Sequence, residues 1–420
     1  MRKTGWWLAI ASISMLLVIS PVQAKSKKYR PFDPGMTQAW TEIDPAEVYP
    51  DFEYQGLTPA CSNCPGTASD KFTFFAKGGK QNNLVIFFQG GGACWDAMNC
   101  YHVPTYTQEQ QETQADFADT AGMGIFDTHN PKNPFKKWGF VYIPYCTGDL
   151  HWGASDHDYP LNPADPDNSP TITIQHRGFV NFQVVLKWLK AHTKNPERIF
   201  VSGSSAGSYG ATMAFAFIKE AFPRSRLYLL GDAGNGVTAS QFNQQGIYNW
   251  DPQMPSWIFP DGYQPETTIA EIYTALAWEY PRSRLGQYAT AWDATQVFFY
   301  NVMNNIYDPS AWQVADPETG AIFNPAGWLD WHQQMVTFAY DTADAARNYR
   351  YYIAAGTDHT ILRSPKFYTE KVAGIPFAQW VKAMVYKPFN VKHSKGKGRW
   401  RSVECGECGG LDAYLQSADQ

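Results

Sequence analysis

Short apolar runs of strand length alternate with amphipathic stretches of helix length through most of the chain. Continuous apolar runs that predict strands lie at residues 72–76, 84–88, 140–145, 198–202, 227–230 and 349–354. Stretches with apolar residues at helical spacing lie at residues 179–192, 208–221, 294–304 and 377–385. Strands that are apolar throughout are typical of a parallel sheet covered on both faces, and alternation with helices favours crossover connections. The pattern therefore predicts an α/β fold with a mostly parallel central sheet and helices on both of its faces.

The first 24 residues follow a different pattern. Arg2 and Lys3 precede an apolar run from Trp6 to Ile19, and a small-residue cleavage site ends at Ala24. This order is typical of a secretory signal peptide, and the apolar run is short for a membrane span. We therefore expect cleavage after Ala24, no stable membrane insertion of the mature chain, and a location in the periplasm or outside the cell.

The rest of the chain is predicted to be one main domain with two flanking segments. Residues 25–71 show no clear period and predict an N-terminal arm, residues 72–390 form the main domain, and residues 391–420 form a tail that contains cysteines. Two stretches inside the domain, 104–137 and 238–282, are rich in aromatic and polar residues. Long insertions of this kind commonly form the walls or lids of binding sites.

Composition narrows the class of protein. Hydrophobic residues make up 44% of the chain and charged residues 17%, which excludes a disordered chain and leaves ample apolar surface for a core. The net charge of −5 gives no electrostatic support for a nucleic-acid partner. We expect a monomer whose partner is its substrate.

All seven cysteines follow the expected cleavage site, and an oxidising destination permits disulfides. Short sequence separations suggest three local bridges: Cys61–Cys64, Cys94–Cys100 and Cys405–Cys408. At least one thiol must stay free or pair outside the chain because seven is odd. Zinc is the alternative for the two Cys-x-x-Cys pairs, but more than 300 residues separate them, unlike the pairs of a compact zinc motif.

The first candidate catalytic residue lies in the sequence Gly203-Ser204-Ser205-Ala206-Gly207. An apolar strand pattern leads into it and a small-residue helix pattern follows. This is the strand–turn–helix context in which a nucleophilic serine sits on a tight turn. Only Ser205 has glycine two positions before and two positions after it, so Ser205 is the candidate nucleophile. The alternative is a glycine-rich turn that follows a core strand and has no chemical role.

A serine hydroxyl is a weak nucleophile at neutral pH and needs a base. Three histidines follow Ser205 in the chain: His332, His359 and His393. His359 lies five residues after the predicted strand 349–354, in a loop at the end of the sheet where catalytic groups collect. His332 lies in an aromatic helical stretch and His393 in a basic tail, so His359 is the candidate base.

An acid is needed to orient the imidazole and to stabilise its charged form. Asp293 follows an apolar stretch and precedes a predicted helix, between Ser205 and His359 in the chain order expected of this fold. The alternative role for Asp293 is a helix N-cap, which is a common position for aspartate. Asp232 and Asp358 are the competing acids, although the side chain of Asp358 neighbours His359 in sequence and is poorly placed to face it.

The glycine run Gly90-Gly91-Gly92-Ala93 follows an early predicted strand. Glycines allow backbone N–H groups to approach a developing oxyanion without obstruction by side chains. We expect the N–H groups of Gly91, Gly92 and Ala206 to form this oxyanion hole. The alternative is a turn that needs glycine only for its backbone conformation.

Together these motifs resemble the pectin acetylesterase/Notum family of serine hydrolases. The resemblance spans about Cys61 to Trp380. It rests on Phe88-Gln89-Gly90-Gly91-Gly92-Ala93-Cys94-Trp95, Pro144-Tyr145-Cys146-Thr147-Gly148-Asp149, His176-Arg177-Gly178, Gly203-Ser204-Ser205-Ala206-Gly207, Asp232-Ala233-Gly234, Ala291-Trp292-Asp293-Ala294-Thr295-Gln296 and Asp358-His359. The resemblance implies an α/β-hydrolase fold and a catalytic role for Ser205, Asp293 and His359. Gly92 stands where the animal members have tryptophan, so their lipid-accepting pocket is not carried over.

The residues predict an exported serine esterase that works through an acyl-serine intermediate, with no metal or organic cofactor. The resemblance implies acetyl esters on cell-wall polysaccharide as substrates. The alternatives are a carboxylesterase for lipid, aromatic or polyester acyl groups, and a non-catalytic carbohydrate-binding protein. A small polar cluster could bind a metal, but such loops are usually solvated or line a cleft; its members are His151, Asp156, His157 and Asp158.

The two substrate classes predict different binding sites. A polysaccharide needs an open groove, walled by the insertions 104–137 and 238–282. Four aromatic residues of the second insertion are candidates for stacking on sugar rings: Tyr248, Trp250, Trp257 and Tyr263. A lipid esterase should instead show a closed apolar tunnel.

Overall fold

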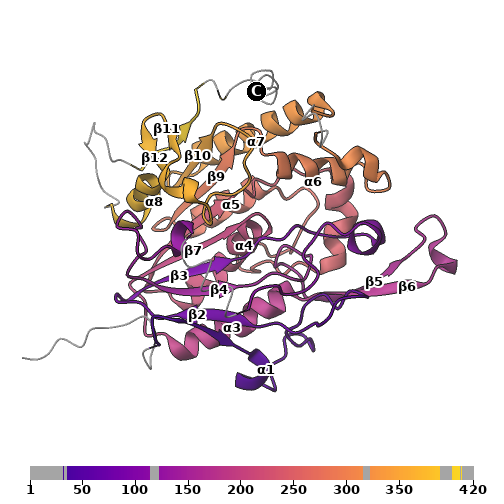
Figure 1. Ribbon diagram of the computed structural model, residues 1–420, viewed down its shortest axis with the longest axis horizontal. Coiled ribbons are helices and arrows are strands. Elements are labelled where there is room, and N and C mark those ends of the chain that lie inside the picture. Colours follow the sequence, from indigo (N-terminus) through magenta and orange to yellow (C-terminus); the bar gives the residue numbers. More distant parts are fainter. Residues whose placement is uncertain are drawn as a thin grey trace, which may run out of the picture.

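Nine strands of the described part of the chain form one sheet at the centre of the computed structural model (Figure 1). The structure describes residues 32, 36–113, 123–315, 322–387, 400–406 and 408. The expected signal peptide and His393 lie outside the described residues. The strands of the sheet, in spatial order, are β1 (Trp40–Ile43), β2 (Phe74–Lys77), β4 (Gly139–Ile143), β3 (Asn83–Phe88), β7 (Arg198–Ser204), β8 (Arg226–Asp232), β9 (Arg284–Thr290), β10 (Tyr349–Ala354) and β13 (Val403–Glu404).

Most of the sheet is parallel. All neighbouring strands from β4 to β13 pair in parallel, whereas β1 and β2 pair antiparallel at one edge. The six apolar runs of the sequence lie in β2, β3, β4, β7, β8 and β10, which confirms the predicted fold class. Strand β9 was not among the six apolar runs, because Gly286 and Gln287 interrupt its apolar residues. Its side chains are nevertheless buried.

Helices cover both faces of the sheet, as the apolar strands require. They are α1 (Pro45–Val48), α3 (Gly178–His192), α4 (Ala206–Ala221), α5 (Ile269–Glu279), α6 (Ala294–Asn304), α7 (Pro325–Ala345) and α8 (Phe377–Tyr386). Alternate residues of β3 separate the two faces: Leu84, Ile86 and Phe88 pack with α3, α4 and α5, and Val85 and Phe87 pack with α8. None of the described helices is both long enough and apolar enough to cross a membrane.

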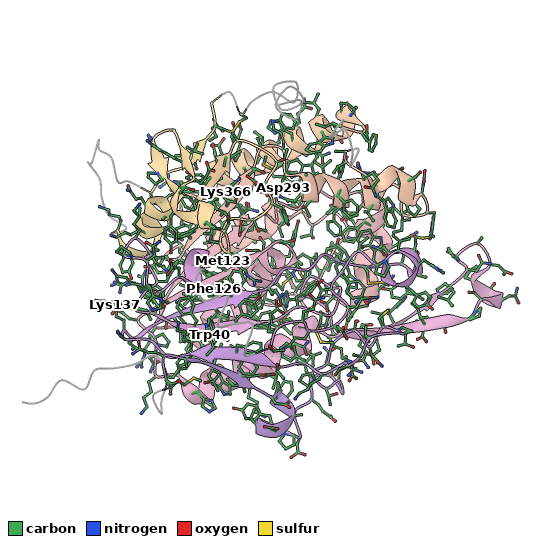
Figure 2. All side chains as sticks on the ribbon, viewed as in Figure 1. Trp40, Met123, Phe126, Lys137, Asp293 and Lys366 are labelled. Atoms are coloured by element: carbon green, nitrogen blue, oxygen red, sulfur yellow. A yellow bond between two sulfur atoms is a disulfide. The ribbon has the colours of Figure 1, made fainter. Side chains whose placement is uncertain are left out.

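The N-terminal arm and the C-terminal tail both contribute to the sheet. Strand β1, within residues 25–71, extends one edge, and β13, within residues 391–420, extends the other by pairing with β10. Trp40 of β1 packs its ring 6.0 Å from that of Phe126, and both are labelled in Figure 2. These short edge strands have too few residues to show a period in the sequence.

The second long insertion contains regular structure. The second insertion, 238–282, contains α5, whose residues Ile272 and Leu276 are buried in the main core. A capping box between Thr268 and Glu271 starts this helix. A separate hairpin of β5 (Ser155–Pro160) and β6 (Thr171–His176) extends away from the body in Figure 1, and β11 (Lys371–Val372) pairs with β12 (Ile375–Pro376).

One predicted disulfide is wrong. Cys61 bonds to Cys146, 85 residues away, and not to Cys64, which is a free and buried thiol. The N–H of Ser62 donates to the Cys146 carbonyl at 2.9 Å, so the two backbone segments run side by side and place the sulfurs together. The bridges Cys94–Cys100 and Cys405–Cys408 are formed as predicted.

Candidate active site

Ser205 lies at the junction between β7 and α4, in a backbone conformation that L-residues rarely adopt. Its φ and ψ are 57° and −126°. The turn leaves no space for side chains on either side: a Cβ on Gly203 would lie 2.0 Å from the Gly207 carbonyl oxygen, and a Cβ on Gly207 would lie 2.0 Å from that of Phe88. The Ser205 N–H donates to the Asp232 carbonyl at 2.8 Å. The glycines of the motif are therefore steric requirements of a strained strand-to-helix turn.

His359 and Asp293 meet in a partly buried hydrogen bond. His359 Nδ1 lies 2.9 Å from Oδ1 and 2.8 Å from Oδ2 of Asp293, whose side chain is fully buried. Burial by itself lowers the pKa of His359, but the Asp293 carboxylate outweighs it, so the net direction is upward. His359 Nε2 has no hydrogen-bond partner among the described residues.

Asp293 also caps helix α6, which was the alternative role for it in the sequence. Its Oδ1 accepts from the Gln296 N–H at 3.0 Å, and its Oδ2 accepts from the Gln296 amide at 2.9 Å. The cap and the bond to His359 coexist because each carboxylate oxygen has more than one lone pair. Asp293 is labelled in Figure 2, where it lies beside α6.

The other candidate residues lie elsewhere. The Asp358 side chain is exposed and forms an ion pair with Lys366. The ring of His332 stacks on Trp292 at 4.2 Å, and its Nδ1 bonds the Ala291 carbonyl at 2.7 Å. The ring is therefore held by packing, as its position in an aromatic helix suggested.

Asp232 connects the serine turn to the histidine loop. Its buried carboxylate accepts hydrogen bonds from Ser204 Oγ at 2.6 Å, from the Ile361 N–H at 3.0 Å and from the Leu362 N–H at 2.9 Å. Burial raises the pKa of Asp232 to about 6, with these three donors partly offsetting the shift. The carboxylate therefore holds the chain immediately before Ser205 and shortly after His359.

The glycine loop lies directly against Ser205. A Cβ on Gly90 would come within 2.7 Å of the Ser205 Cβ. Gly92 and Ala206 line the same cavity as Ser205 and His359, whereas Gly91 lines a neighbouring hollow. Ala206 begins the 16-residue helix α4, whose N-terminus favours negative charge.

The sequence did not reveal how this loop is held. The ring of His151 is fully buried beneath the loop, and its Nε2–H donates to the Gln89 carbonyl at 2.9 Å. Burial lowers the pKa of His151 to about 4, so the ring is neutral at neutral pH. Asp149 in turn accepts from the His151 N–H at 3.1 Å. The sequence analysis considered His151 only as a member of a polar cluster that could bind a metal.

The structure does not assemble that stretch into one cluster. Asp156 lies on the β5–β6 hairpin and pairs with Arg177, and Asp158 accepts from Thr173 on the neighbouring strand. His157 lies between them in sequence, on β5. His151 instead donates a hydrogen bond to the Gln89 carbonyl.

An apolar cavity of about 840 Å³, part of it open to solvent, lies beside Ser205 and His359. Most of the walls away from Ser205 and His359 are apolar; they include Trp95, Trp152, Phe242, Ile247, Phe299 and Met303. The second insertion contributes to these walls, as expected, but it forms an apolar cavity and not an open groove.

Two of the four aromatics considered for sugar stacking are not available. Trp250 is fully buried in the core, and Tyr263 is buried in the cavity wall. Tyr248 and Trp257 are about half exposed, at 47% and 46%. Trp257 bonds the hydroxyl of Tyr280 at 2.9 Å, and that hydroxyl reaches Glu220 near the C-terminal end of α4, a helix length away from Ser205.

Comparison with known proteins supports one family. A sequence profile of the family described as pectinacetylesterase matches residues 66–251, which include the glycine loop and Ser205. Pectin acetylesterase 7 and pectin acetylesterase 11 of Arabidopsis thaliana are each 26% identical to this chain over 156 residues. The match covers 36% of this chain and 37% of each relative, so the chain matches little more than a third of the length of these relatives.

The fold agrees with that of a solved structure, the Wnt deacylase Notum from Drosophila. The TM-score is 0.51 and the sequence identity 16%, over 78% of this chain and 89% of that chain. At this identity the likeness shows the fold alone, with the same mainly parallel sheet between helices. The part of the chain that contains the glycine loop and Ser205 is thus similar to pectin acetylesterases, and the whole fold is similar to the α/β-hydrolase fold of Notum.

Proposed function

We propose that this protein is a serine esterase in which Ser205 is the nucleophile, His359 the base and Asp293 the acid. The observation that carries the proposal is one cavity shared by the strained Ser205 turn and the partly buried His359–Asp293 pair. The carboxylate holds the imidazole with Nδ1–H directed at itself, which leaves Nε2 as the nitrogen that can accept a proton.

In the first half of the reaction, Ser205 Oγ attacks the ester carbonyl carbon while His359 Nε2 takes the hydroxyl proton. The negative charge on the carbonyl oxygen is stabilised by the N–H groups of Gly91, Gly92 and Ala206. The tetrahedral intermediate collapses when His359 returns that proton to the alcohol oxygen. The C–O bond to the alcohol breaks, and the acyl group stays on Ser205.

Water completes the reaction. His359 Nε2 takes a proton from the water as its oxygen attacks the acyl carbon, and the same oxyanion donors stabilise the second tetrahedral intermediate. His359 then returns the proton to Ser205 Oγ as the acid leaves. The scheme balances with side chains, backbone amides and water.

We propose that the acyl group is larger than acetyl. The walls beside Ser205 and His359 are mostly apolar, so they favour a longer acyl chain, of which each further buried methylene gains about 0.8 kcal/mol. The second candidate is removal of acetyl groups from cell-wall polysaccharide, including pectin. The names of the matched family and of the curated relatives favour it.

A series of p-nitrophenyl esters from two to sixteen carbons separates the candidates. We expect kcat/KM to rise from acetyl to a maximum between about four and ten carbons, because added methylenes enter an apolar cavity of limited volume. A maximum at acetyl, with faster release of acetate from acetylated pectin than from any longer ester, would favour the second candidate.

Labelling with a serine-directed phosphonate tests the chemistry independently of the acyl group. We expect a single modification on Ser205 and complete loss of ester hydrolysis. Equal labelling of the Ser205→Ala variant, or full activity of that variant, would reject the serine esterase mechanism altogether.

We also propose that the protein is exported and cleaved after Ala24, on the basis of the pattern in residues 1–24. Mass spectrometry of the N-terminus of protein recovered from the expressing cells and their medium tests this. A retained Met1 in all fractions would contradict it.

A further inference from the structure

A polar hollow also borders the glycine loop, beside the apolar cavity. It encloses about 700 Å³, including the solvent above it. Its lining, which we call the polar trough, includes Thr67, Gly91, Thr107, Gln108, Glu109 and Gln111. The mechanism proposed above uses only one of these residues, Gly91.

The glycine loop itself links the trough to the site of chemistry. Gly92 lines the apolar cavity and Gly91 lines the trough, so consecutive residues of one loop face the two hollows. The Thr107 N–H donates to the Gly91 carbonyl at 2.8 Å, which fixes the trough wall to the loop. The acyl and alcohol parts of an ester diverge from the carbonyl carbon. If the acyl part occupies the apolar cavity, the alcohol part must lie elsewhere beside the glycine loop. The polar trough is a hollow in that position.

The groups that line the trough match an alcohol with many hydroxyls. Thr67 Oγ1 donates to the Cys64 carbonyl at 2.8 Å and keeps its lone pairs available. Glu109 Oε2 accepts from the Ala68 N–H at 2.8 Å, which leaves Oε1 able to accept a further bond. The exposed amide of Gln111 can both donate and accept. Hydroxyls, which both donate and accept, are complementary to this mixture.

The charge around the trough selects against anions. The described stretch 81–113, which includes the glycine loop and the trough residues from Thr105 to Gln111, has no lysine or arginine. Glu109 is the charged side chain among the described residues that line the trough. A ligand carboxylate placed there would face the Glu109 carboxylate within a Debye length.

We propose that the polar trough is the subsite for the alcohol part of the ester, and that it takes an uncharged sugar in preference to a uronate. This inference rests on the proposed esterase function.

A matched pair of sugar esters tests the proposal on the purified mature protein. The pair is methyl glucopyranoside and methyl glucopyranosiduronate, the second with a free carboxylate and each bearing the same acyl group, with the p-nitrophenyl ester of that acid as the sugar-free reference. We expect kcat/KM for the glucoside ester to exceed that for the glucuronate ester by about tenfold at low salt. The ratio should shrink as salt screens the repulsion.

Variants of the trough give the second test. Glu109→Gln keeps an acceptor for the Ala68 N–H and removes the charge, so it should raise kcat/KM for the glucuronate ester about fivefold and leave a smaller glucoside preference. Gln111→Ala should raise KM for the glucoside ester at least threefold more than KM for the sugar-free ester. The matched controls are Glu47→Gln on α1 and Gln379→Ala on α8, both exposed and on other elements, which should change neither ratio.

Two results would overturn the inference. One is equal or faster hydrolysis of the glucuronate ester by the unmodified protein. The other is a pair of trough variants that behave like their controls. Failure of the esterase proposal would look different, because the sugar-free ester would then not be hydrolysed, or its hydrolysis would persist in Ser205→Ala.

Discussion

Asp293 shows that one side chain can satisfy two local requirements. It caps α6 through Gln296 and bonds the His359 imidazole through both carboxylate oxygens. The two roles can be separated by substitution. Asparagine is as good a helix cap as aspartate, but it has no charge with which to stabilise an imidazolium.

Substitution of the three proposed catalytic residues should therefore give a graded and non-additive loss of activity. We expect kcat/KM to fall about 10⁴-fold or more for Ser205→Ala and His359→Ala, and somewhat less for Asp293→Asn. The double variant Ser205→Ala/His359→Ala should be no worse than either single variant. The melting temperature of Asp293→Asn should fall modestly, because asparagine keeps the helix cap but its single oxygen cannot accept every hydrogen bond that the two carboxylate oxygens accept. A mild effect of Asp293→Asn beside a severe effect of Asp358→Asn would show that the acid is wrongly assigned.

The pH dependence of kcat/KM provides a second measurement on the same residues. The neutral imidazole is the active form, so activity should be lost as the pH falls through the pKa of His359. Burial lowers that pKa, but the Asp293 carboxylate raises it by more. The midpoint should therefore lie above the ordinary histidine value of about 6.5. In Asp293→Asn the lowering by burial remains and the raising charge is absent, so the residual activity should show a lower midpoint. An unchanged midpoint would contradict the pairing.

At the scale of elements, the site depends on three strand ends that are distant in sequence. Ser205 follows β7, Asp232 ends β8, and His359 lies in the loop after β10. Parallel strands bring these ends to one edge of the sheet. The Asp232 carboxylate then ties the serine turn to the histidine loop through Ser204, Ile361 and Leu362.

Loss of the hydrogen bonds to Asp232 should displace His359 without removing the charge that stabilises its imidazolium. Asp232→Asn keeps one acceptor oxygen but cannot accept all three hydrogen bonds, so we expect kcat to fall about tenfold and stability by about 1–3 kcal/mol. The fall in kcat should be smaller than that for Asp293→Asn. Steady-state kinetics and urea denaturation measure both quantities. A larger kinetic loss for Asp232→Asn than for Asp293→Asn would make Asp232 the acid.

At the scale of the whole molecule, the Cys61–Cys146 bridge ties the N-terminal arm to the loop after β4. It closes 85 residues of chain, compared with three for Cys405–Cys408. In the chain-entropy account, a bridge stabilises the fold by restricting the unfolded chain, and the effect grows with the length of the loop.

Removal of the long bridge should therefore cost more stability than removal of the short one. We expect the double variant Cys61→Ala/Cys146→Ala to lose about 3–5 kcal/mol and Cys405→Ala/Cys408→Ala about 1–2 kcal/mol. Chemical denaturation under non-reducing conditions measures the difference. Equal losses for the two pairs would show that packing around the sulfurs, and not loop closure, dominates.

Much of the fold was predictable because it depends on local patterns. Apolar runs such as 84–88 and 198–202 must be buried on both faces, which requires a parallel sheet and covering helices. The tight turn around Ser205 was predictable for the same reason, since only glycine fits at positions 203 and 207. The structure also brought His359 to Asp293, in the chain order that such a sheet imposes.

Contacts between distant segments were decided only by the tertiary structure. Two cysteines separated by two residues carry no signal that one of them pairs 85 residues away, because pairing depends on which backbones run side by side. The exposure of the aromatic residues in the second insertion was likewise not predictable from the sequence. Their composition suited an open, sugar-stacking wall, but Trp250 is buried in the core and Tyr263 is buried in the wall of an apolar cavity. A residue's chemistry can be inferred from its type and its neighbours in sequence, whereas its exposure depends on the whole packed chain.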